Sequence, residues 1–189
     1  MPFTVNPADR VDDLARAAVG LLDADDIRSL TVRRLAEAAR VSPSALIAHF
    51  ENKERILVLV TRRIGDWLVE AIALDVRDHG SGGVLPHDST RPLVRAWLGL
   101  TELARSYEVL GLHIAEAELE IAYQLRASFG LVDKDDVIGP TLVALVNGLW
   151  MRMCAPADPM SHEHALTILR DLCGRIGVPL RAGTYGRTA

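Results

Sequence analysis

Cationic residues gather around several predicted helix starts between residues 27 and 64, a combination that could bind phosphate groups. From Ile27 to Ile64 the chain has eight Lys or Arg residues against three Asp or Glu, whereas residues 65–189 have eleven against sixteen. The whole chain carries a net charge of -4, so the basic portion is local. Each phosphate that such a patch neutralises releases counterions, which favours nucleic-acid binding. The alternative is an ordinary solvated helix surface.

The elements that must position these cations are predicted to be helices. Apolar residues recur at helical spacing, and Pro and Gly gather in three stretches, at residues 78–92, at residues 154–161 and after residue 174. With 189 residues, 49% of them hydrophobic, the chain can bury a sizeable core. We therefore expect an all-α fold.

Capping residues predict where the first four helices begin. Asn6, followed by a proline, is expected to cap the first helix, and Thr31 a short second one. Ser42 is expected to cap a third helix that begins at Pro43, and Asn52 a long fourth helix that ends near residue 79. Two short helices joined by about three residues are typical of a helix-turn-helix, whose second helix enters the DNA major groove. The expected core positions of this pair are Leu35, Ala36, Leu46 and Phe50.

The stretch LTVRRLAEAARVSPSALIAHFENKERIL, residues 30–57, resembles the DNA-binding domain of the TetR family of transcriptional repressors, and the likeness extends over about residues 11–59. It is carried by Thr31, Leu35, Ala36, Ala39, Val41, Ser42, Leu46, His49, Phe50 and Lys53. The resemblance implies backbone contacts by Thr31, Arg33 and His49, base-edge contacts by Pro43, Ser44 and Ala45, and a phosphate anchor at Lys53. Ser44 can hydrogen-bond to more than one base, whereas Pro43 and Ala45 offer only apolar contacts.

Two positions in this segment differ from the family pattern. Arg40 stands in the turn where the family usually has glycine in a left-handed conformation, which costs a non-glycine residue about 1 kcal/mol. Ile47 stands where the family commonly has a tyrosine that hydrogen-bonds to a phosphate. We expect the free energy of DNA binding to be less favourable by about 1 kcal/mol unless Arg40 replaces that contact.

The remaining sequence predicts four further helices. In the stretch 111–129, the residues expected to face inward are Leu112, Ala115, Leu119, Ala122 and Phe129. The last two helices are more apolar than the surface of a monomer needs, and could pair with their copies as a four-helix interface with twofold symmetry. The residues expected in that interface are Val146, Leu149, Trp150, Met153, Leu166 and Leu169.

A second resemblance concerns the C-terminal part, which looks like the subgroup of the betaine-operon regulator, a choline-responsive protein. It is carried by Trp97, Asn147, Gly148, Leu149, Trp150 and Arg152. We do not expect choline itself, because quaternary ammonium groups are bound by aromatic cages and only 5% of this chain is aromatic. The residues expected to line a ligand pocket are Trp67, Trp97, Thr101, Tyr107, Tyr123 and Asn147. Filling of the core is the alternative role for the aromatic ones.

The resemblance to the TetR family implies a homodimeric, ligand-responsive repressor that binds a palindromic operator and is released by a small-molecule effector. Its expected domains are a helix-turn-helix domain at 1–55, a ligand-binding and dimerisation domain at 56–176 and a flexible tail at 177–189. The sequence has no apolar run of 18 residues and no secretory signal pattern, so we expect a cytoplasmic protein with no membrane partner.

Two other classes of function stay open. One is an enzyme, for which His162, His164 and Cys154 are the candidates, although no HExxH spacing, nucleophile elbow or phosphate loop occurs. We expect neither catalysis nor a cofactor or metal. The other is a helical interaction protein that has lost operator binding. Cys154 and Cys173 are interpreted as buried thiols, with a redox switch as the alternative.

Overall fold

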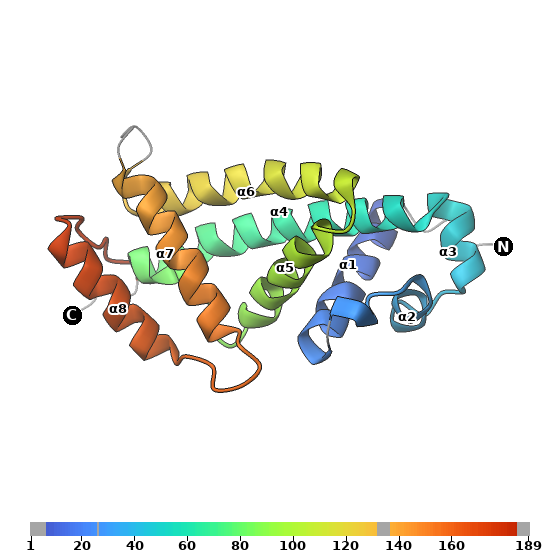
Figure 1. Ribbon diagram of the computed structural model, residues 1–189, viewed down its shortest axis with the longest axis horizontal. Coiled ribbons are helices and arrows are strands. Elements are labelled where there is room, and N and C mark those ends of the chain that lie inside the picture. Colours follow the sequence, from blue (N-terminus) through green and yellow to red (C-terminus); the bar gives the residue numbers. More distant parts are fainter. Residues whose placement is uncertain (1–6, 26, 132–136, 185–189) are drawn as a thin grey trace. The chain divides into compact units, whose positions relative to one another are not determined.

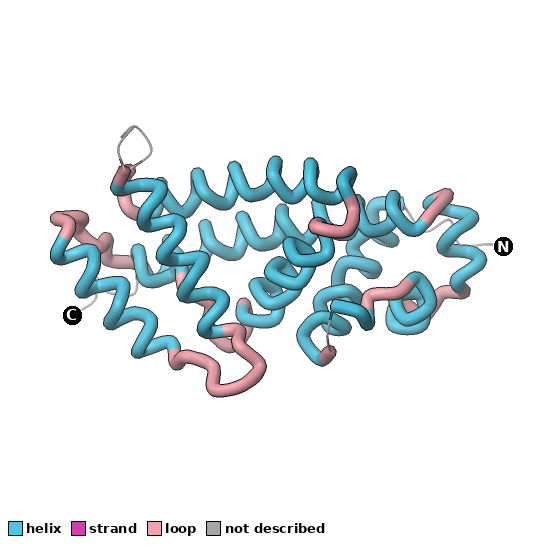
Figure 2. Tube along the Cα trace, in the orientation of Figure 1, coloured by secondary structure: helices cyan, strands magenta, loops and turns pink. Residues whose placement is uncertain are grey.

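The protein is built from helices and loops in all the residues described by the structure, a computed structural model that covers residues 7–25, 27–131 and 137–184 (Figure 1; Figure 2). The all-α prediction is confirmed. The α-helices are α1 (Pro7–Ala24), α2 (Val32–Ala38), α3 (Pro43–Phe50), α4 (Lys53–His79), α5 (Arg91–Ala104), α6 (Glu108–Ser128), α7 (Ile138–Met153) and α8 (His162–Arg175), with short 3-10 turns η1 (Ile27–Ser29) and η2 (Gly80–Val84).

The chain divides into two compact units. The first unit comprises Met1–Trp67 and Arg95–Ala117, and the second comprises Leu68–Val94 and Glu118–Ala189. Helices α4, α5 and α6 therefore each contribute residues to both units. The first unit extends past residue 55, where we expect the DNA-binding domain to end. The end of the DNA-binding domain at residue 55 therefore stays a prediction.

The first unit surrounds a core to which its helices each contribute apolar side chains. Figure 1 shows α1, α2 and α3 gathered beside the start of α4. Arg63 of α4 binds Asp12 of α1 through two hydrogen bonds of 2.6 and 3.0 Å, and this contact holds the pKa of the Asp12 carboxyl below its usual value. The buried side chains include Leu14, Ala18, Leu35, Leu46, Phe50, Ile56, Val60, Trp97, Leu100 and Leu110.

The second unit is organised around Trp150 of α7, whose side chain is only 1% exposed. Its indole Nε1 donates a 2.7 Å hydrogen bond to the carbonyl oxygen of Val84. The loop that carries this carbonyl lies directly against α4: a Cβ atom on Gly83 would stand 2.3 Å from backbone atoms of Asp75. Only glycine fits such a close approach, so this loop, α4 and α7 hold one another in place.

The C-terminal segment packs onto the second unit as far as residue 184. Ser81 and Arg181 exchange two hydrogen bonds, from Ser81 N to the Arg181 carbonyl at 3.0 Å and from Arg181 N to Ser81 Oγ at 2.9 Å. Thr184 Oγ1 donates to the Arg77 carbonyl at 2.7 Å, and Val178 is buried. These contacts do not favour the expected flexible tail for residues 177–184, where it stays a prediction, and residues 185–189 lie outside the described range.

The inward face of α6 differs from the one that the sequence predicts. Leu112 and Leu119, expected in the core, are 64% and 75% exposed. The helix has apolar residues on more than one side, so its periodicity fits two orientations, and the packing selects the other stripe. The buried residues in and just after α6 are Leu110, Ile114, Ile121, Leu125, Ser128 and Phe129.

Candidate nucleic-acid interface

Two capped helices form a helix-turn-helix in the first unit. Thr31 Oγ1 accepts a hydrogen bond from Arg34 N at 3.2 Å at the start of α2, and Ser42 Oγ accepts one from Ala45 N at 3.1 Å at the start of α3. Pro43 is the first residue of α3, where its missing N–H costs no hydrogen bond. The cap predictions for Thr31 and Ser42 are confirmed; Asn6 lies outside the described residues.

The turn between α2 and α3 is a Schellman motif with Arg40 in the left-handed conformation. Arg40 N donates to the Glu37 carbonyl at 3.1 Å, and Val41 N donates to the Ala36 carbonyl at 2.9 Å. Arg40 has a φ of 57°. The predicted left-handed backbone conformation of this arginine is therefore confirmed. The steric cost expected of a non-glycine residue there stays a prediction.

Replacing Arg40 by glycine is expected to raise the free energy of unfolding by about 1 kcal/mol, because glycine adopts positive φ without a Cβ clash. Urea denaturation measures the change. The matched control is Ala38→Gly, an exposed position inside α2, where glycine should lower stability by about 0.5–1 kcal/mol. A loss of stability in both variants would contradict a strained Arg40.

Helix α3 is held by its buried face and presents a nearly uncharged outer face. Leu46 is 1% exposed and Phe50 is 5% exposed. The exposed side chains are Pro43, Ser44, Ala45, Ile47, Ala48 and His49. The hydroxyl groups of Ser44 and Ser42 lie 3.3 Å apart, and the His49 ring contacts Phe50 edge-on. The outer face can therefore donate or accept hydrogen bonds at Ser44 and His49, and otherwise offers apolar contacts.

Introducing tyrosine at Ile47 is expected to raise affinity for duplex DNA about fivefold, because an exposed hydroxyl there can donate to a phosphate. The Ile47 side chain is 37% exposed, so the larger ring does not displace core residues. Fluorescence anisotropy with a labelled duplex measures the change. Ala48→Tyr, at the next exposed position of α3, is the control, and an equal gain in both variants would contradict a specific role for position 47.

The cations that flank α3 differ in how their charge is balanced. Arg33 of α2 is exposed and donates to Glu37 Oε1 at 3.0 Å, so part of its charge is compensated. Lys53, the first residue of α4, donates through Nζ to the neutral Tyr107 Oη at 2.9 Å. The spacing of four residues between Arg33 and Glu37 could have revealed the first pair. No feature of the sequence indicated the pair of Lys53 and Tyr107.

The N-terminus of α4 is capped as predicted. Asn52 Oδ1 accepts a hydrogen bond from Arg55 N at 2.8 Å. Lys53 follows directly, at the start of a 27-residue helix. A cation beside the unpaired N–H groups of a helix start is suited to a phosphate.

The six side chains that we expect to line a ligand pocket do not gather around one of the described hollows. In the first unit, Trp97 is 4% exposed and packs against Gly65, and Thr101 donates to the Trp97 carbonyl. Tyr107 binds Lys53, and the Trp67 ring lies beside the guanidinium groups of Arg16 and Arg63. In the second unit, Tyr123 and Asn147 are exposed.

The six residues that we expect in a dimer interface are mostly buried inside their own chain. The structure places five of the six in the core of the second unit, with side chains no more than 4% exposed: Val146, Leu149, Trp150, Met153 and Leu169. Leu166 is partly exposed. The exposed face of α7 lies on the other side of the helix and includes Thr141, Ala144, Asn147, Gly148 and Met151. The assignment of these five residues to a dimer interface stays a prediction, which their burial within the chain does not favour.

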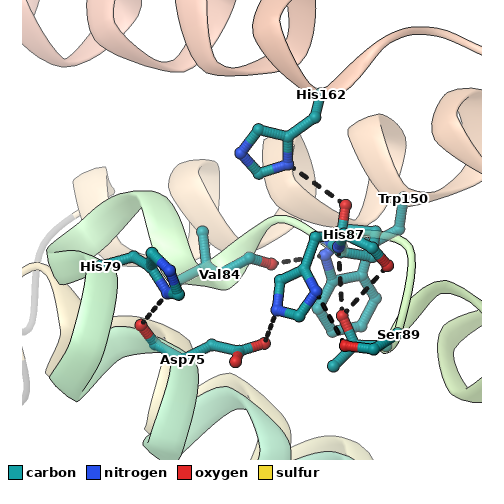
Figure 3. A network of polar contacts seen from close by, with 9 residues as sticks. Asp75, His79, Val84, His87, Ser89, Trp150 and His162 are labelled. Carbon is teal, nitrogen blue, oxygen red and sulfur yellow. Dashed lines mark hydrogen bonds and ion pairs between the residues drawn. The ribbon is translucent and has the colours of Figure 1, made fainter.

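A chain of polar contacts in the second unit has residue types that occur in hydrolases. Figure 3 shows His87 between Asp75 and Ser89, with Nε2 3.0 Å from Asp75 Oδ2 and Nδ1 3.0 Å from Ser89 Oγ. The backbone N–H groups of Thr90 and Arg91 both donate to the His87 carbonyl, so they do not form an oxyanion hole. The contacts tie the loop before α5 to α4, which is a structural role.

Of the other candidates for enzymatic chemistry, His162 and Cys154 are tied into the fold, whereas His164 is exposed. His162 Nδ1 lies 3.2 Å from the Pro86 carbonyl oxygen (Figure 3). Cys154 and Cys173 are buried and do not form a disulfide, and burial raises the pKa of the Cys173 thiol. In residues 7–25, 27–131 and 137–184 no cluster of three metal-ligating side chains is found. None of the helices there has both the length and the apolarity needed to cross a membrane.

Comparison with known proteins relates this geometry to a family of regulators. Residues 14–60, which run from α1 into α4, match the model of the family described as bacterial regulatory proteins, tetR family. No curated protein is similar enough to the chain to count as a match.

Several solved structures share the fold over nearly their whole length. A transcriptional regulator from Rhodococcus sp. Rha1 is 22% identical with a TM-score of 0.70, over 89% of this chain and 97% of that one. A protein assigned to the TetR family of transcriptional regulators, from Rhodococcus sp., is 24% identical with a TM-score of 0.67, over 89% and 98%. The multidrug binding protein EbrR, complexed with proflavin, is 22% identical with a TM-score of 0.59, over 86% and 99%. At these identities the likeness shows a common fold.

Proposed function

We propose that this chain, whose residues 14–60 are a helix-turn-helix domain of the TetR family, is a homodimeric transcriptional repressor that an effector releases from a palindromic operator. The observation that carries the proposal is the capped helix α3, which is anchored by Leu46 and Phe50 and leaves Ser44 and His49 exposed. Arg33 and Lys53 supply cations at the starts of the flanking helices. The proposed DNA partner lies in the bacterial cytoplasm, which is where we place the protein.

The operator can be found by enrichment of duplexes with a random central segment on the immobilised protein. The proposal predicts enriched sequences with two inverted half-sites, whose centres lie about one helical turn or a multiple of it apart. Enrichment without any common sequence would contradict the proposed operator recognition. The alternative, a helical interaction protein with weak operator binding, is favoured by Ile47, which cannot make the expected hydrogen bond to phosphate.

We propose the exposed face of α7 as the contact with the second copy. This face has small or apolar side chains at Ala144, Gly148 and Met151, beside the polar Thr141 and Asn147. Small residues allow the backbones of two helices to approach closely. Helix α8 packs on α7, and its side chains Ile168 and Leu172 are apolar and partly exposed.

A negative charge on this face is expected to dissociate the dimer. A Cβ atom added at Gly148 would meet no other atom within 4 Å, so Gly148→Glu leaves the chain's own core intact. Sedimentation should give twice the 20.6 kDa chain mass for the unaltered protein and for Ala73→Glu, an exposed control on α4. Gly148→Glu should sediment as a monomer, and a dimer of this variant would contradict the proposed face.

We propose a small organic molecule as the effector. The fold shared with EbrR, which was crystallised with proflavin, supports this class. The hollow that α4, α7 and the loop before α5 form in the second unit admits about one water molecule, so binding there requires the surrounding side chains to move apart. Its lining is mainly apolar, with Asp75 as a charged group. Membership of the betaine-operon subgroup stays a proposal, and the low share of aromatic residues, 5% of the chain, does not favour an aromatic cage.

A further inference from the structure

Lys53 is fixed by a residue that lies far away in the sequence. Its Nζ donates a 2.9 Å hydrogen bond to Tyr107 Oη and stands 5.3 Å from the centre of the Tyr107 ring. Both residues belong to the first unit, and the hydrogen bond is partly buried. The long lysine side chain therefore has a defined position before any ligand arrives.

Tyr107 is itself held by the backbone of the turn between α5 and α6. Its N–H donates to the Ala104 carbonyl at 3.2 Å, and its carbonyl accepts from Gly111 N at 3.0 Å. The phenol is thus presented from a fixed turn at the start of α6. The first unit joins this turn to the helix-turn-helix in one compact body.

The contact orders the ammonium group without cancelling its charge. A phenol is neutral, and it occupies one of the three N–H donors of the ammonium group, so two donors and the full positive charge remain for an anion. Arg33 differs in this respect, because its partner Glu37 is a carboxylate. Ordering a lysine side chain in advance removes part of the entropy cost of binding.

We propose that Tyr107 is a positioning residue for DNA binding, which holds Lys53 so that its ammonium group meets a phosphate of the duplex. The inference rests on the proposed function, because it takes DNA as the ligand. It extends the DNA-binding surface to the α5–α6 turn, which lies well outside residues 14–60, the part that matches the family model. A displacement of that turn would move the phosphate anchor directly.

A double-mutant cycle on duplex DNA of random sequence tests the proposal, because binding to any duplex depends on phosphate contacts. The proteins are the unaltered chain, Tyr107→Phe, Lys53→Met and the double variant. Tyr107→Phe keeps the ring and removes only the hydroxyl, and Tyr123→Phe is the matched control at an exposed tyrosine. Thermal unfolding by circular dichroism verifies that all variants are folded.

Tyr107→Phe is expected to lower affinity about threefold to fivefold in the unaltered background and to have no effect in the Lys53→Met background. Lys53→Met should also reduce the slope of log affinity against log salt concentration by about 0.9, the value for one phosphate contact. An equal effect of Tyr107→Phe in both backgrounds, or no effect in either, would overturn the positioning role and leave the proposed function standing. Failure of the unaltered protein to bind any duplex would overturn both.

Discussion

Replacing Trp150 by alanine is expected to lower the free energy of unfolding by about 3–5 kcal/mol, as for other large buried aromatic side chains. The side chain is almost wholly buried in the second unit, and its removal leaves a cavity between α7 and the loop before α5. The Val84 carbonyl would also lose its hydrogen-bond donor. Urea denaturation followed by circular dichroism measures the change.

Two further variants separate the contributions of Trp150. Trp150→Phe retains much of the packing and removes the donor to Val84, so we expect a loss of about 1–3 kcal/mol. Leu119→Ala, on α6 of the same unit at a side chain that is 75% exposed, should change stability by less than about 0.5 kcal/mol. A Trp150→Ala variant as stable as Leu119→Ala would show that Trp150 does not organise the second unit.

The double variant Arg33→Ala, Lys53→Ala is expected to bind duplex DNA about 100-fold more weakly than the unaltered protein at low salt, if each lost cation costs about tenfold. Its salt slope should also fall by about 1.8, which corresponds to two phosphate contacts. Arg33 stands near the start of α2 and Lys53 at the start of α4. Anisotropy titrations at several salt concentrations measure both quantities.

The control for this variant removes two positive charges from elsewhere. Arg170 and Arg175 are exposed on α8 of the second unit, so Arg170→Ala, Arg175→Ala changes the net charge equally. We expect this control to retain its affinity within about twofold, because only cations near the duplex release counterions. Equal weakening in both double variants would indicate a general charge effect and no defined interface.

The local features of the helix-turn-helix could be predicted from the sequence because they depend on neighbouring residues. Thr31, Ser42 and Asn52 each cap the helix that follows them, as their side-chain chemistry and positions predict. The positive φ of Arg40 follows from its place at the end of a short helix. Leu35 and Leu46 are buried for the same local reason, since helical periodicity places them on the inner faces.

The sequence could not show which side of an apolar helix meets its own chain. In α6 the prediction chose the stripe of Leu112 and Leu119, which is exposed. In α7 it assigned Val146 and Trp150 to a partner, although they fill the core of the second unit. Apolar periodicity reports that a face is covered and does not identify what covers it.

Contacts between residues far apart in the chain were also beyond the sequence. Lys53 and Tyr107 are separated by 54 positions, and they were expected in two different sites, the phosphate anchor and the ligand pocket. The hydrogen bond between them depends on how α5 and α6 return to the start of α4 within the first unit. Such a pairing is fixed by tertiary packing, which residue spacing does not encode.

The proposed function depends above all on the recognition of a specific DNA sequence by α3. The most direct measurement is fluorescence anisotropy of the protein on a labelled duplex from the region immediately upstream of its own gene, compared with a random duplex of equal length at several salt concentrations. We expect binding to the upstream duplex to be at least about 1,000-fold tighter than to the random one, with both affinities falling as salt rises. Equal affinities for the upstream duplex and the random one across the whole salt range would contradict it.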